Sequence, residues 1–298
     1  MLDIGIVIVN YNVASLLRKC LRSVMESKGV ALSVCVVDNC SSDGSVAMVR
    51  EEFPLVHVIE NPMNCGYAAA NNAGLRFFFS EMPVCRYLLL LNPDTELPPD
   101  ALQNMVAFMD SRPDVGVAGP MLVLPDGKLD LACRRSFPTP TVFVYRALGF
   151  SRLFPKSKRF ARYNLTYLDP KQTVEVDAVV GAFMMVRREA IKHAGMLDED
   201  FFMYGEDLDW SYRIKQLGWT VMYYPQVTVL HHKGESSKQV RTRATSEFYR
   251  AMRVFYRKHY YAQNVFLINW LMLGAIHLRG NMAYVANLLR PAGKRRMI

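Results

Sequence analysis

The chain has 298 residues, 51% of them hydrophobic and 21% charged, with a formal net charge of +9. This length suits one large α/β domain with an extension, or two small domains, and supplies a sizeable apolar core. Six scattered cysteines without a Cys-x-x-Cys pair argue against a disulfide framework or a zinc site and indicate thiols in a reducing compartment. The opening residues lack a basic region and a long apolar run, so the sequence predicts no signal peptide and a cytosolic protein.

A buried strand is predicted at residues 4–9, followed by a helix and by a second strand at residues 32–37. A strand, a helix and a strand joined by short connections predict a right-handed βαβ unit with a parallel sheet. No phosphate-cradling glycine fingerprint follows the first strand, which argues against a nicotinamide enzyme.

Polar residues follow both of these strands, which places them at one edge of the predicted sheet. Asn10-Tyr11-Asn12 ends the first strand, and Asp38-Asn39 ends the second. Asp38 could accept hydrogen bonds from a ribose hydroxyl or a base N–H. A simple turn role for Asp38 is the alternative.

A third strand, at residues 56–59, leads into a turn and then an alanine-rich helix. The small residues of this stretch, such as Gly66, permit close approach of a ligand or of a neighbouring element. Asn71 and Asn72 are poor residues for a helix interior, so we expect a local reason for them.

An unbroken apolar run, Tyr87 to Leu91, is cut off by Asn92-Pro93-Asp94. The run predicts a strand buried on both faces, and Pro93 makes its polar tip a rigid turn. In an open α/β sheet, ligands bind outside the carboxyl ends of the strands, so Asn92 and Asp94 are candidates to contact one. Alternatively, Asp94 caps a helix that begins near Pro98.

The segment from Cys133 to about Gln172 lacks clear periodicity and mixes cations with aromatic residues. A long irregular insertion in a compact domain is usually functional or mobile. We interpret it as a loop over the substrate site, with disorder as the alternative. Further strands are predicted at residues 174–180, 183–186, 219–223 and 227–230.

A helix that begins near Glu206 has carboxylates in its first turn, which the helix dipole favours. Glu206 and Asp209 share one face of this helix, whereas Asp207 projects from another. Arg213 could reach a bound diphosphate or simply pair with Asp209, and the sequence leaves both open.

The last third of the chain is strongly basic and suits a phosphate-rich partner: nucleic acid, an anionic membrane surface or a phosphorylated substrate. A solvated basic helix face is the alternative. Its cations, set against only Glu235 and Glu247, are Lys233, Lys238, Arg241, Arg243, Arg250, Arg253, Arg257, Lys258, Arg279, Arg290, Lys294, Arg295 and Arg296.

Several short motifs, each at an expected strand end or helix start, occur in a fixed order over residues 3 to 240. They are Val9 to Asn12, Val36 to Asn39, Ser42 to Ser45, Asn64 to Tyr67, Asn71 to Gly74, Leu91 to Asp94, Gly181-Ala182, Phe202 to Asp209 and His231 to Gly234. Single motifs are weak, but the ordered set resembles an inverting family 2 glycosyltransferase of the GT-A fold, particularly its bacterial rhamnosyltransferase-like branch.

The resemblance implies an α/β fold of the GT-A type that binds a nucleotide-diphospho-sugar. This fold has a mostly parallel central sheet flanked by helices and, here, a C-terminal helical extension. Residues 1–240 would form the glycosyltransferase domain, and residues 241–298 a basic, aromatic-rich extension.

The resemblance also implies roles for individual residues. Asp207 would be the catalytic base, and Asp94 and His231 would hold Mg²⁺ or Mn²⁺, with His232 as a lesser candidate. Asn92 replaces the first acid of the family's Asp-x-Asp motif, so Asp94 remains the single carboxylate ligand. Asp38 would bind the base or ribose. The predicted donor site further includes Tyr11, Asn12, Asn39, Asn64, Gly66, Asn72, Asn92 and Arg213, while Gly181, Ala182 and Glu206 would lie near the acceptor or sugar.

The implied donor is most simply dTDP-rhamnose, with a UDP-sugar as the alternative, and the implied acceptor is a lipid-linked glycan in cell-surface polysaccharide synthesis. Residues 265–276 form an apolar run that is too short to cross a bilayer. With cations on both sides, the run suits a helix on an anionic membrane surface at the cytoplasmic face of the inner membrane. Alternatively, it packs on the catalytic domain.

The sequence offers less support for two other functions. A sugar-phosphate nucleotidyltransferase shares the layered architecture but needs a glycine-rich loop bearing Arg and Lys after the first strand, and that loop is missing. A nucleic-acid-binding protein would explain the charge, yet no recognisable module is present, so no nucleic-acid partner is expected.

Overall fold

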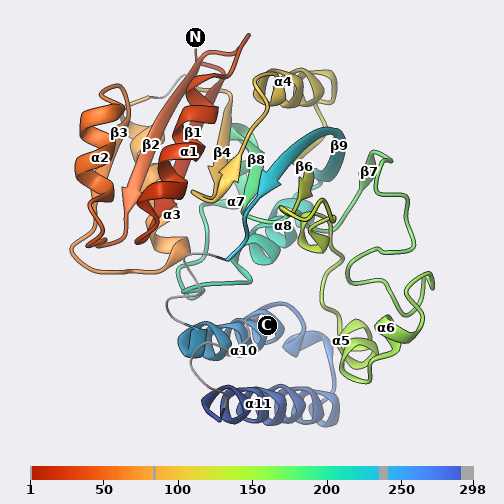
Figure 1. Cartoon of the computed structure of the whole chain (residues 1–298). Helices are drawn as coiled ribbons and strands as arrows, with labels where there is room; N and C mark the ends of the chain where they lie inside the picture. Colours follow the sequence, from red (N-terminus) through yellow and green to blue (C-terminus); the bar gives the residue numbers. More distant parts are fainter. Residues whose placement is uncertain (1, 83–84, 235–240, 290–298) are drawn as a thin grey trace.

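The computed structural model describes residues 2–82, 85–234 and 241–289. Their centre is a nine-stranded sheet with the order β3-β2-β1-β4-β8-β6-β9-β5, in which β7 pairs with β9 (Figure 1). The strands are β1 Ile4–Asn10, β2 Leu32–Asp38, β3 His57–Glu60, β4 Tyr87–Leu91, β5 Thr95–Glu96, β6 Val115–Val123, β7 Val174–Glu175, β8 Phe183–Arg187 and β9 Thr220–His231.

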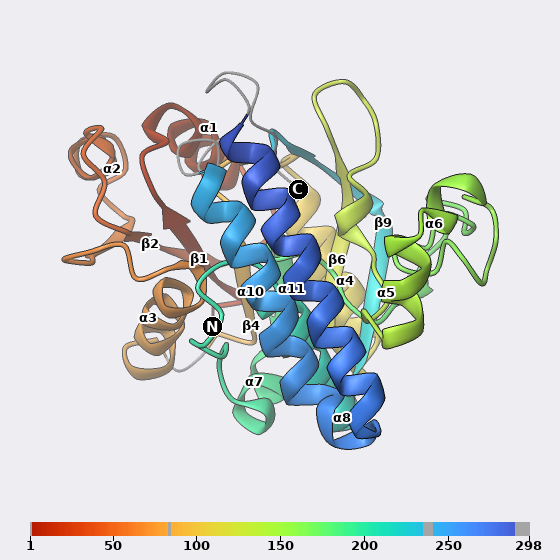
Figure 2. The same cartoon turned by 90° about the horizontal axis from the view of Figure 1, so that it is seen from below.

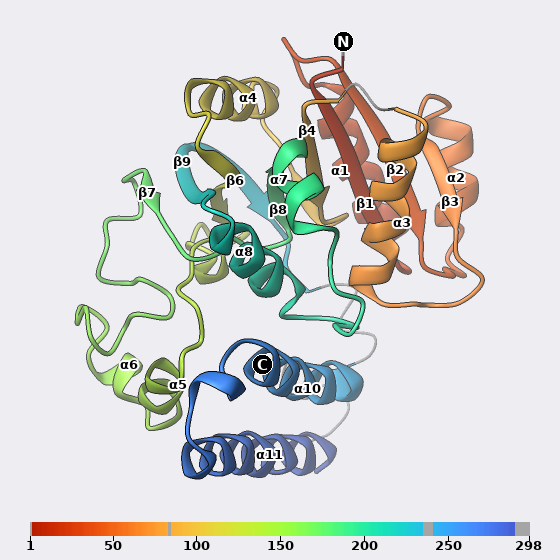
Figure 3. The same cartoon turned by 180° about the vertical axis from the view of Figure 1, so that it is seen from behind.

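Helices cover both faces of this sheet. Helices α1 and α2 lie on one face, and α3, α7 and α8 lie on the other (Figures 1 and 3). The helices are α1 Ala14–Met25, α2 Ser45–Glu52, α3 Tyr67–Ser80, α4 Ala101–Ser111, α5 Pro140–Ala147, α6 Phe150–Leu153, α7 Arg188–Ala194, α8 Glu206–Gln216, α10 Arg241–His259 and α11 Phe266–Leu288, with 3₁₀ turns at Leu131–Cys133 and Tyr261–Gln263.

Strands β1 to β4 form the parallel half of the sheet, as the sequence predicts. Every residue of β1 and of β4 is buried, because helices cover both faces and the strands are continuous apolar runs. Asn10 pairs with Asp38 in the register of β1 and β2, and Ile8 pairs with Leu91 in that of β1 and β4. The polar residues that follow these strands therefore meet at one edge.

The other half of the sheet is mixed, which the sequence does not reveal. Strand β8 runs antiparallel to both β4 and β6, whereas β9 runs parallel to β6. The two strands expected at residues 219–223 and 227–230 are one strand, β9, whose register shifts around Pro225 because proline cannot donate to the ladder. The strand expected at residues 174–180 is shorter than predicted and consists of β7, Val174–Glu175. Beyond it, Ala178 forms an isolated bridge with Arg135.

The segment from Cys133 to Gln172 is more ordered than its sequence suggests. It contains α5, which begins with Thr139 as its N-cap and Pro140 in its first turn, and the short helix α6. Arg134 and Arg135 at its start are buried. The disorder alternative is wrong for this segment.

The C-terminal helices α10 and α11 form an antiparallel pair, with α10 between α11 and the α/β domain (Figures 1 and 3). They share a second hydrophobic cluster with Phe201 and Leu208 of the α/β domain. Gly280 lets α11 approach α10 closely, because a Cβ at this position would lie 3.1 Å from Tyr249 Cβ. Within the described ranges, no helix is long and apolar enough to cross a membrane.

Some of the predicted features lie outside the described residues. These are the cations Lys238, Arg290, Lys294, Arg295 and Arg296 of the basic tail, together with Glu235. The six cysteines are free thiols, in agreement with the sequence prediction.

Candidate active site

Asp94 and His231 face each other at the end of the sheet. Strand β5 follows the Asn92-Pro93-Asp94 turn and pairs with β9, so that Thr95 lies opposite His231. Asp94 Oδ1 and His231 Nε2 lie 3.4 Å apart, and both atoms are buried without a hydrogen-bond partner in the described part of the chain. Helix α4 begins only at Ala101, with Asp100 at its N-cap, so Asp94 does not cap it.

Asp130, which the sequence does not single out, orients His231. Its Oδ2 lies 3.0 Å from His231 Nδ1, and its Oδ1 accepts a hydrogen bond from Lys233. Although burial disfavours the imidazolium, the hydrogen bond to Asp130 and the nearby Asp94 raise the pKa of His231 to about 9. With Asp130 on Nδ1, Nε2 is the nitrogen that points at Asp94. Only the fold joins these residues, which lie 101 positions apart.

The Asp94 and His231 pair fits a divalent cation, but only as part of a larger ligand set. The described residues contain no group of three or more His, Cys, Asp or Glu side chains that could hold a metal. Ligand atoms that share an octahedral Mg²⁺ at 2.0–2.1 Å lie about 3 Å apart, close to the separation seen here. A carboxylate–histidine pair such as Asp130–His231 is a common outer shell of metal sites. His232 instead contacts Glu96 Oε1 at 2.6 Å.

The predicted nucleotide end of the site is a tightly bonded loop. Asp38 Oδ1 accepts a hydrogen bond from Asn10 Nδ2 at 2.8 Å, and Asp38 Oδ2 accepts one from the Ser41 N–H at 2.8 Å. Asn12 adopts a left-handed backbone conformation with φ of 52°, which Asn tolerates better than most residues, and it accepts a hydrogen bond from the Ser42 N–H. Tyr11 lies half-buried beside this loop.

Two of the predicted donor residues hold a neighbouring turn together. Asn39 Nδ2 donates to Asn64 Oδ1 and to the Gly66 carbonyl, and Asn64 Oδ1 also accepts from the Gly66 N–H. Gly66 has φ of 88°, and a Cβ there would lie 2.5 Å from the Phe202 carbonyl oxygen. The neighbour that requires glycine here is therefore the backbone at Phe202.

Asn72 has a structural partner that explains its place in a helix. Its side chain donates to the Leu197 carbonyl at 2.8 Å and accepts from the Leu197 N–H at 3.0 Å. Asn72 also contacts Glu199 Oε1. These contacts attach α3 to the loop that precedes α8 and do not support the predicted donor role of Asn72.

Asp207 is a buried carboxylate held by three donors. Its Oδ2 lies 2.7 Å from Arg135 Nη2 and accepts the Gly181 N–H at 3.1 Å, while its Oδ1 accepts the Leu208 N–H at 2.7 Å. Arg135 also donates to the Val179 carbonyl. Burial disfavours the positive charge of Arg135, but the neighbouring Asp207 carboxylate raises the pKa of the Arg135 guanidinium. The sequence marks Arg135 only as one cation of an irregular segment.

Glu206 lies beside Asp207 but has a different environment. It is buried, and its Oε2 has no hydrogen-bond partner among the described residues. Burial, followed by the adjacent Asp207 carboxylate, raises the pKa of Glu206 well above its usual range. The two adjacent carboxyl groups therefore differ in environment: Asp207 is paired with a cation, whereas Glu206 is desolvated.

The Gly181-Ala182 turn joins Asp207 to the Asn92-Pro93-Asp94 turn. The Gly181 N–H donates to Asp207, and the Gly181 carbonyl accepts a hydrogen bond from Tyr67 Oη at 2.9 Å. The Ala182 carbonyl accepts the Asn92 N–H at 3.0 Å. Burial and then the nearby Glu206 and Asp207 carboxylates raise the pKa of Tyr67.

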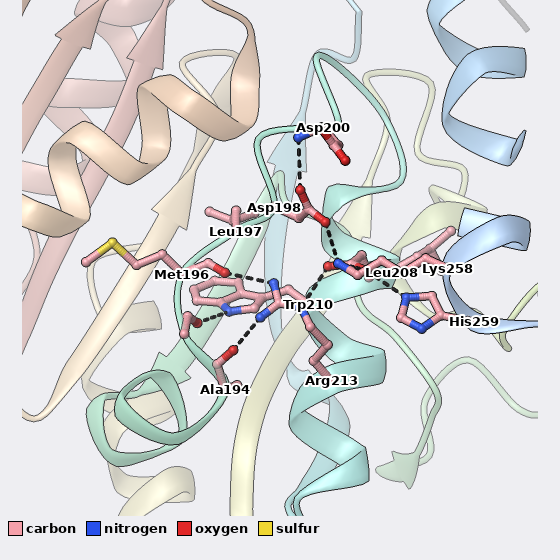
Figure 4. A network of polar contacts seen from close by, with 12 residues as sticks. Ala194, Met196, Leu197, Asp198, Asp200, Leu208, Trp210, Arg213, Lys258 and His259 are labelled. Atoms are coloured by element: carbon pink, nitrogen blue, oxygen red, sulfur yellow. Dashed lines mark hydrogen bonds and ion pairs between the residues drawn. The ribbon is translucent and has the colours of Figure 1, made fainter. Parts of the chain in front are cut away.

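Arg213 belongs to a different network, shown in Figure 4. Its Nε donates to Asp209 Oδ2 at 2.8 Å, and its remaining nitrogens donate to the carbonyls of Ala194 and Met196. The Asp209 pairing that the sequence left open is therefore present. These contacts do not support the predicted donor role of Arg213.

Asp209 connects this network to the C-terminal extension. The residue is 0% exposed, and its Oδ1 lies 2.7 Å from His259 Nε2 and 2.8 Å from Lys258 Nζ, both on α10. Burial raises the pKa of Asp209. The pKa is nevertheless lowered to about 2, because His259 and Lys258 donate hydrogen bonds to the carboxylate and Arg213 lies nearby with its positive charge. The helix that carries Glu206 and Asp207 is thus attached to α10.

We expect Asp209→Asn to lower the free energy of unfolding by about 3 kcal/mol, because breaking a buried ion pair leaves uncompensated charge. Denaturant unfolding at pH 7 measures this. Since the folded pKa lies below the unfolded one, the contribution of Asp209 is present above about pH 4 and is lost as the pH falls toward 2. Asp126→Asn, at an exposed turn pair with Lys128, is the control and should leave the free energy of unfolding nearly unchanged, because solvent screens exposed ion pairs. Equal losses would contradict the role of Asp209.

The strand-end loops and the buried Glu206-Asp207 pair follow the pattern of α/β enzymes, a class that binds its ligands outside the carboxyl ends of the strands. The chain belongs to the glycosyltransferase family whose sequence model, described as "Glycosyl transferase family 2", matches residues 5–195. The predicted enzyme class and family are confirmed.

Two relatives are rhamnosyltransferases. The chain is 25% identical over 291 residues to the N-acetylglucosaminyl-diphospho-decaprenol L-rhamnosyltransferase of Mycobacterium tuberculosis, a match that covers 96% of this chain and 94% of the relative. It is 22% identical over 238 residues to the dTDP-rhamnosyl transferase RfbF of Shigella flexneri, which covers 80% and 72%, respectively.

A solved structure with a similar fold is the mannosyltransferase PcManGT from Pyrobaculum calidifontis in complex with GDP-Man and Mn²⁺. It has a TM-score of 0.57 and 18% identity, and the match covers 95% of this chain and 72% of that one. This likeness confirms the predicted GT-A type of fold.

Proposed function

We propose that this protein is a metal-dependent, inverting glycosyltransferase that moves L-rhamnose from dTDP-rhamnose to a lipid-linked saccharide in cell-surface polysaccharide synthesis. The activities of the two rhamnosyltransferase relatives support the sugar, the dTDP donor and the lipid-linked acceptor. The same chemistry with a UDP-sugar is the alternative donor assignment.

One observation carries this proposal. Buried side-chain atoms without a partner are uncommon in folded proteins and call for an explanation. Four such atoms belong to residues that the sequence assigned to the site: Asn92 Oδ1, Asp94 Oδ1, His231 Nε2 and Glu206 Oε2. Asp94 Oδ1 and His231 Nε2 face each other at 3.4 Å, but none of the four atoms has a hydrogen-bond partner among the described residues. A bound metal, diphosphate and sugar would supply such partners.

Asp94 and His231 are the residues that would hold Mg²⁺ or Mn²⁺ with the donor diphosphate. Because the pKa of His231 is raised to about 9, His231 would release the proton of Nε2 on binding the cation. When bound, the cation stabilises the negative charge that grows on the departing nucleoside diphosphate. Manganese is favoured modestly by the histidine ligand, and the GDP-Man and Mn²⁺ complex of PcManGT supports a divalent ion in this fold.

Asp207 is the base in the proposed mechanism. It takes the proton from an acceptor hydroxyl as that oxygen attacks the anomeric carbon, opposite the departing diphosphate, and one such displacement inverts the anomeric configuration. Arg135 and the Gly181 N–H hold Oδ2 of Asp207, which fixes the direction of the carboxylate. Glu206, desolvated and unpaired, is suited to hydrogen-bond a sugar hydroxyl as a neutral acid.

The first test is donor and metal recognition, measured as thermal stability with dTDP, UDP or GDP, each with and without Mn²⁺. A nucleotide at 100 times its Kd should add about 2.7 kcal/mol, and we expect this gain for dTDP with Mn²⁺. Asp94→Ala should lose the metal-dependent part, whereas Glu96→Ala, in the same turn but in contact with His232, should keep it. A preference for UDP would change the sugar assignment, and no response to any nucleotide would overturn the proposal.

The base is tested by Asp207→Asn, which keeps the shape of the side chain but removes its proton affinity. The turnover number should fall about 100- to 10,000-fold, the usual range for a general base. The Kd for dTDP should stay within a factor of about three, which is below 1 kcal/mol. Steady-state transfer and nucleotide binding are the two measurements. Glu206→Gln is the comparison: a larger loss of turnover there than in Asp207→Asn would show that the base is misassigned.

We further propose that α11 holds the enzyme at the cytoplasmic face of the inner membrane. Helix α11 contains no acidic residue, and large apolar side chains remain exposed on the side that does not pack on α10. Arg279 on α11 and Arg257 on α10 supply positive charge, and anionic lipid attracts such cations. The exposed apolar residues are Val265, Phe266, Leu267, Ile268, Trp270, Leu271, Leu278, Met282, Tyr284, Val285, Leu288 and Leu289.

Membrane contact is tested with the double variant Trp270→Glu and Leu278→Glu, whose side chains are 66% and 62% exposed. Co-sedimentation with anionic vesicles should fall, since both changes place a charge on an apolar surface facing like charge. Leu55→Glu, at an exposed leucine far from α11 in the sequence, is the matched control and should bind as the wild type does. Wild-type sedimentation by the double variant would refute the contact.

A further inference from the structure

An apolar groove lies between α5 and α11, two helices that are far apart in the sequence and run side by side in Figures 1 and 2. Its volume is about 320 Å³. The lining residues are Pro140, Thr141 and Val144 on α5 and Ile268, Leu271 and Met272 on α11.

The walls of this groove are held in place by contacts outside its lining. Arg279 Nη1 on α11 donates at 2.8 Å to the carbonyl of Ala147, the last residue of α5. Below the groove, Met272 and Ile276 are buried in the cluster that includes Phe255, and Phe137 packs against the Phe255 ring with centroids 6.4 Å apart. The groove is therefore preformed in the free protein.

The chemistry of the lining selects an apolar occupant. Val144 and Leu271 are 41% and 54% exposed, and the hydroxyl of Thr141 is the only polar side-chain group of the lining. Removing such side chains from water stabilises a complex by about 25 cal/mol per Å² of apolar surface. A hydrocarbon chain gains this contribution without leaving a polar group unpaired.

The surroundings of the groove select an anionic head group on that chain. Residues 131–168, which include α5 and α6, carry eight Arg and Lys residues and no Asp or Glu. Two of the eight, Arg134 and Arg135, are buried. The other six are exposed: Arg146, Arg152, Lys156, Lys158, Arg159 and Arg162. Of these, Arg159 Nε donates to Tyr145 Oη at 2.8 Å and Arg146 lies over the Tyr163 ring, and all six remain accessible to a phosphate.

The groove also lies within reach of the proposed base. Pro140 on its wall follows Arg135 by five residues, and five residues span at most about 18 Å. Arg135 in turn contacts Asp207 at 2.7 Å. The upper limit of about 18 Å between Pro140 and Arg135 is comparable to the length of a sugar joined to a diphosphate.

We propose that the groove binds the isoprene units nearest the diphosphate of a polyprenyl-diphosphate-linked acceptor, with the exposed cations of residues 146–162 beside the diphosphate. This inference rests on the proposed function, which supplies the class of acceptor. It assigns Ile268 and Leu271 of α11 to one apolar chain in the groove between α5 and α11, and it leaves the other exposed apolar residues of α11 to the bilayer.

The test variant is Val144→Trp, which fills the groove at a partly exposed position. Leu148→Trp, just beyond α5 and outside the lining, is the matched control. With the full chain, the Kd for geranylgeranyl diphosphate should rise about tenfold or more in Val144→Trp, since loss of two buried methylenes is worth that much. It should not change in Leu148→Trp.

Transfer assays give the second readout. With one sugar-diphosphate acceptor carrying either a polyprenyl or a methyl tail, Val144→Trp should raise the KM for the polyprenyl form about tenfold and leave the methyl form unchanged. Equal losses for both tails would indicate a distorted site and overturn the inference. An unchanged KM for both acceptor forms would also overturn the inference.

Two controls separate other occupants of the groove. If Val144→Trp loses binding to acceptor-free anionic vesicles in parallel, the groove serves the bilayer surface and the inference fails. If sedimentation velocity shows a wild-type dimer that Val144→Trp dissociates, a second copy occupies the groove and the inference fails. Wild-type binding of geranylgeranyl diphosphate that is lost in Val144→Trp, without transfer to any acceptor, would instead keep the groove and reject the proposed function.

Discussion

The buried ion pair between Asp207 and Arg135 is the interaction on which the rest of the site depends. A carboxylate away from water needs a cation or several hydrogen-bond donors, and Asp207 obtains them from positions 72 and 26 residues away. The contacts of the Asp207 carboxylate hold three segments together: the start of α8, the Gly181 turn and the beginning of the 133–172 segment. The Asn92 turn joins the same arrangement through Ala182.

The sheet makes this arrangement possible by collecting strand ends at one edge. The parallel half delivers Asp38 and the Asn92-Pro93-Asp94 turn to that edge, while β9, running parallel to β6, brings His231 back to it. Buried apolar strands hold these positions rigidly because helices cover both faces of the sheet.

The C-terminal helices are connected to this chemistry. Lys258 and His259 on α10 both contact the fully buried Asp209, two residues after Asp207 on the same helix. Through α10, α11 and its exposed apolar face are attached to the helix that bears the proposed base. The exposed apolar face of α11 and the buried Glu206-Asp207 pair are therefore parts of one packed unit, joined by a shared hydrophobic cluster.

The sequence by itself determined the parallel βαβ start, the strand-end positions of Asp38 and Asp94, and the helix beginning at Glu206, because apolar runs, turn residues and helix starts are local signals. Only the tertiary structure decided the partners. Asp130 and Arg135 emerged as neighbours of His231 and Asp207, whereas Asn72 and Arg213 were found bonded to backbone carbonyls. A side chain's partner depends on which distant segments the fold brings within about 3 Å, and no local pattern records that distance.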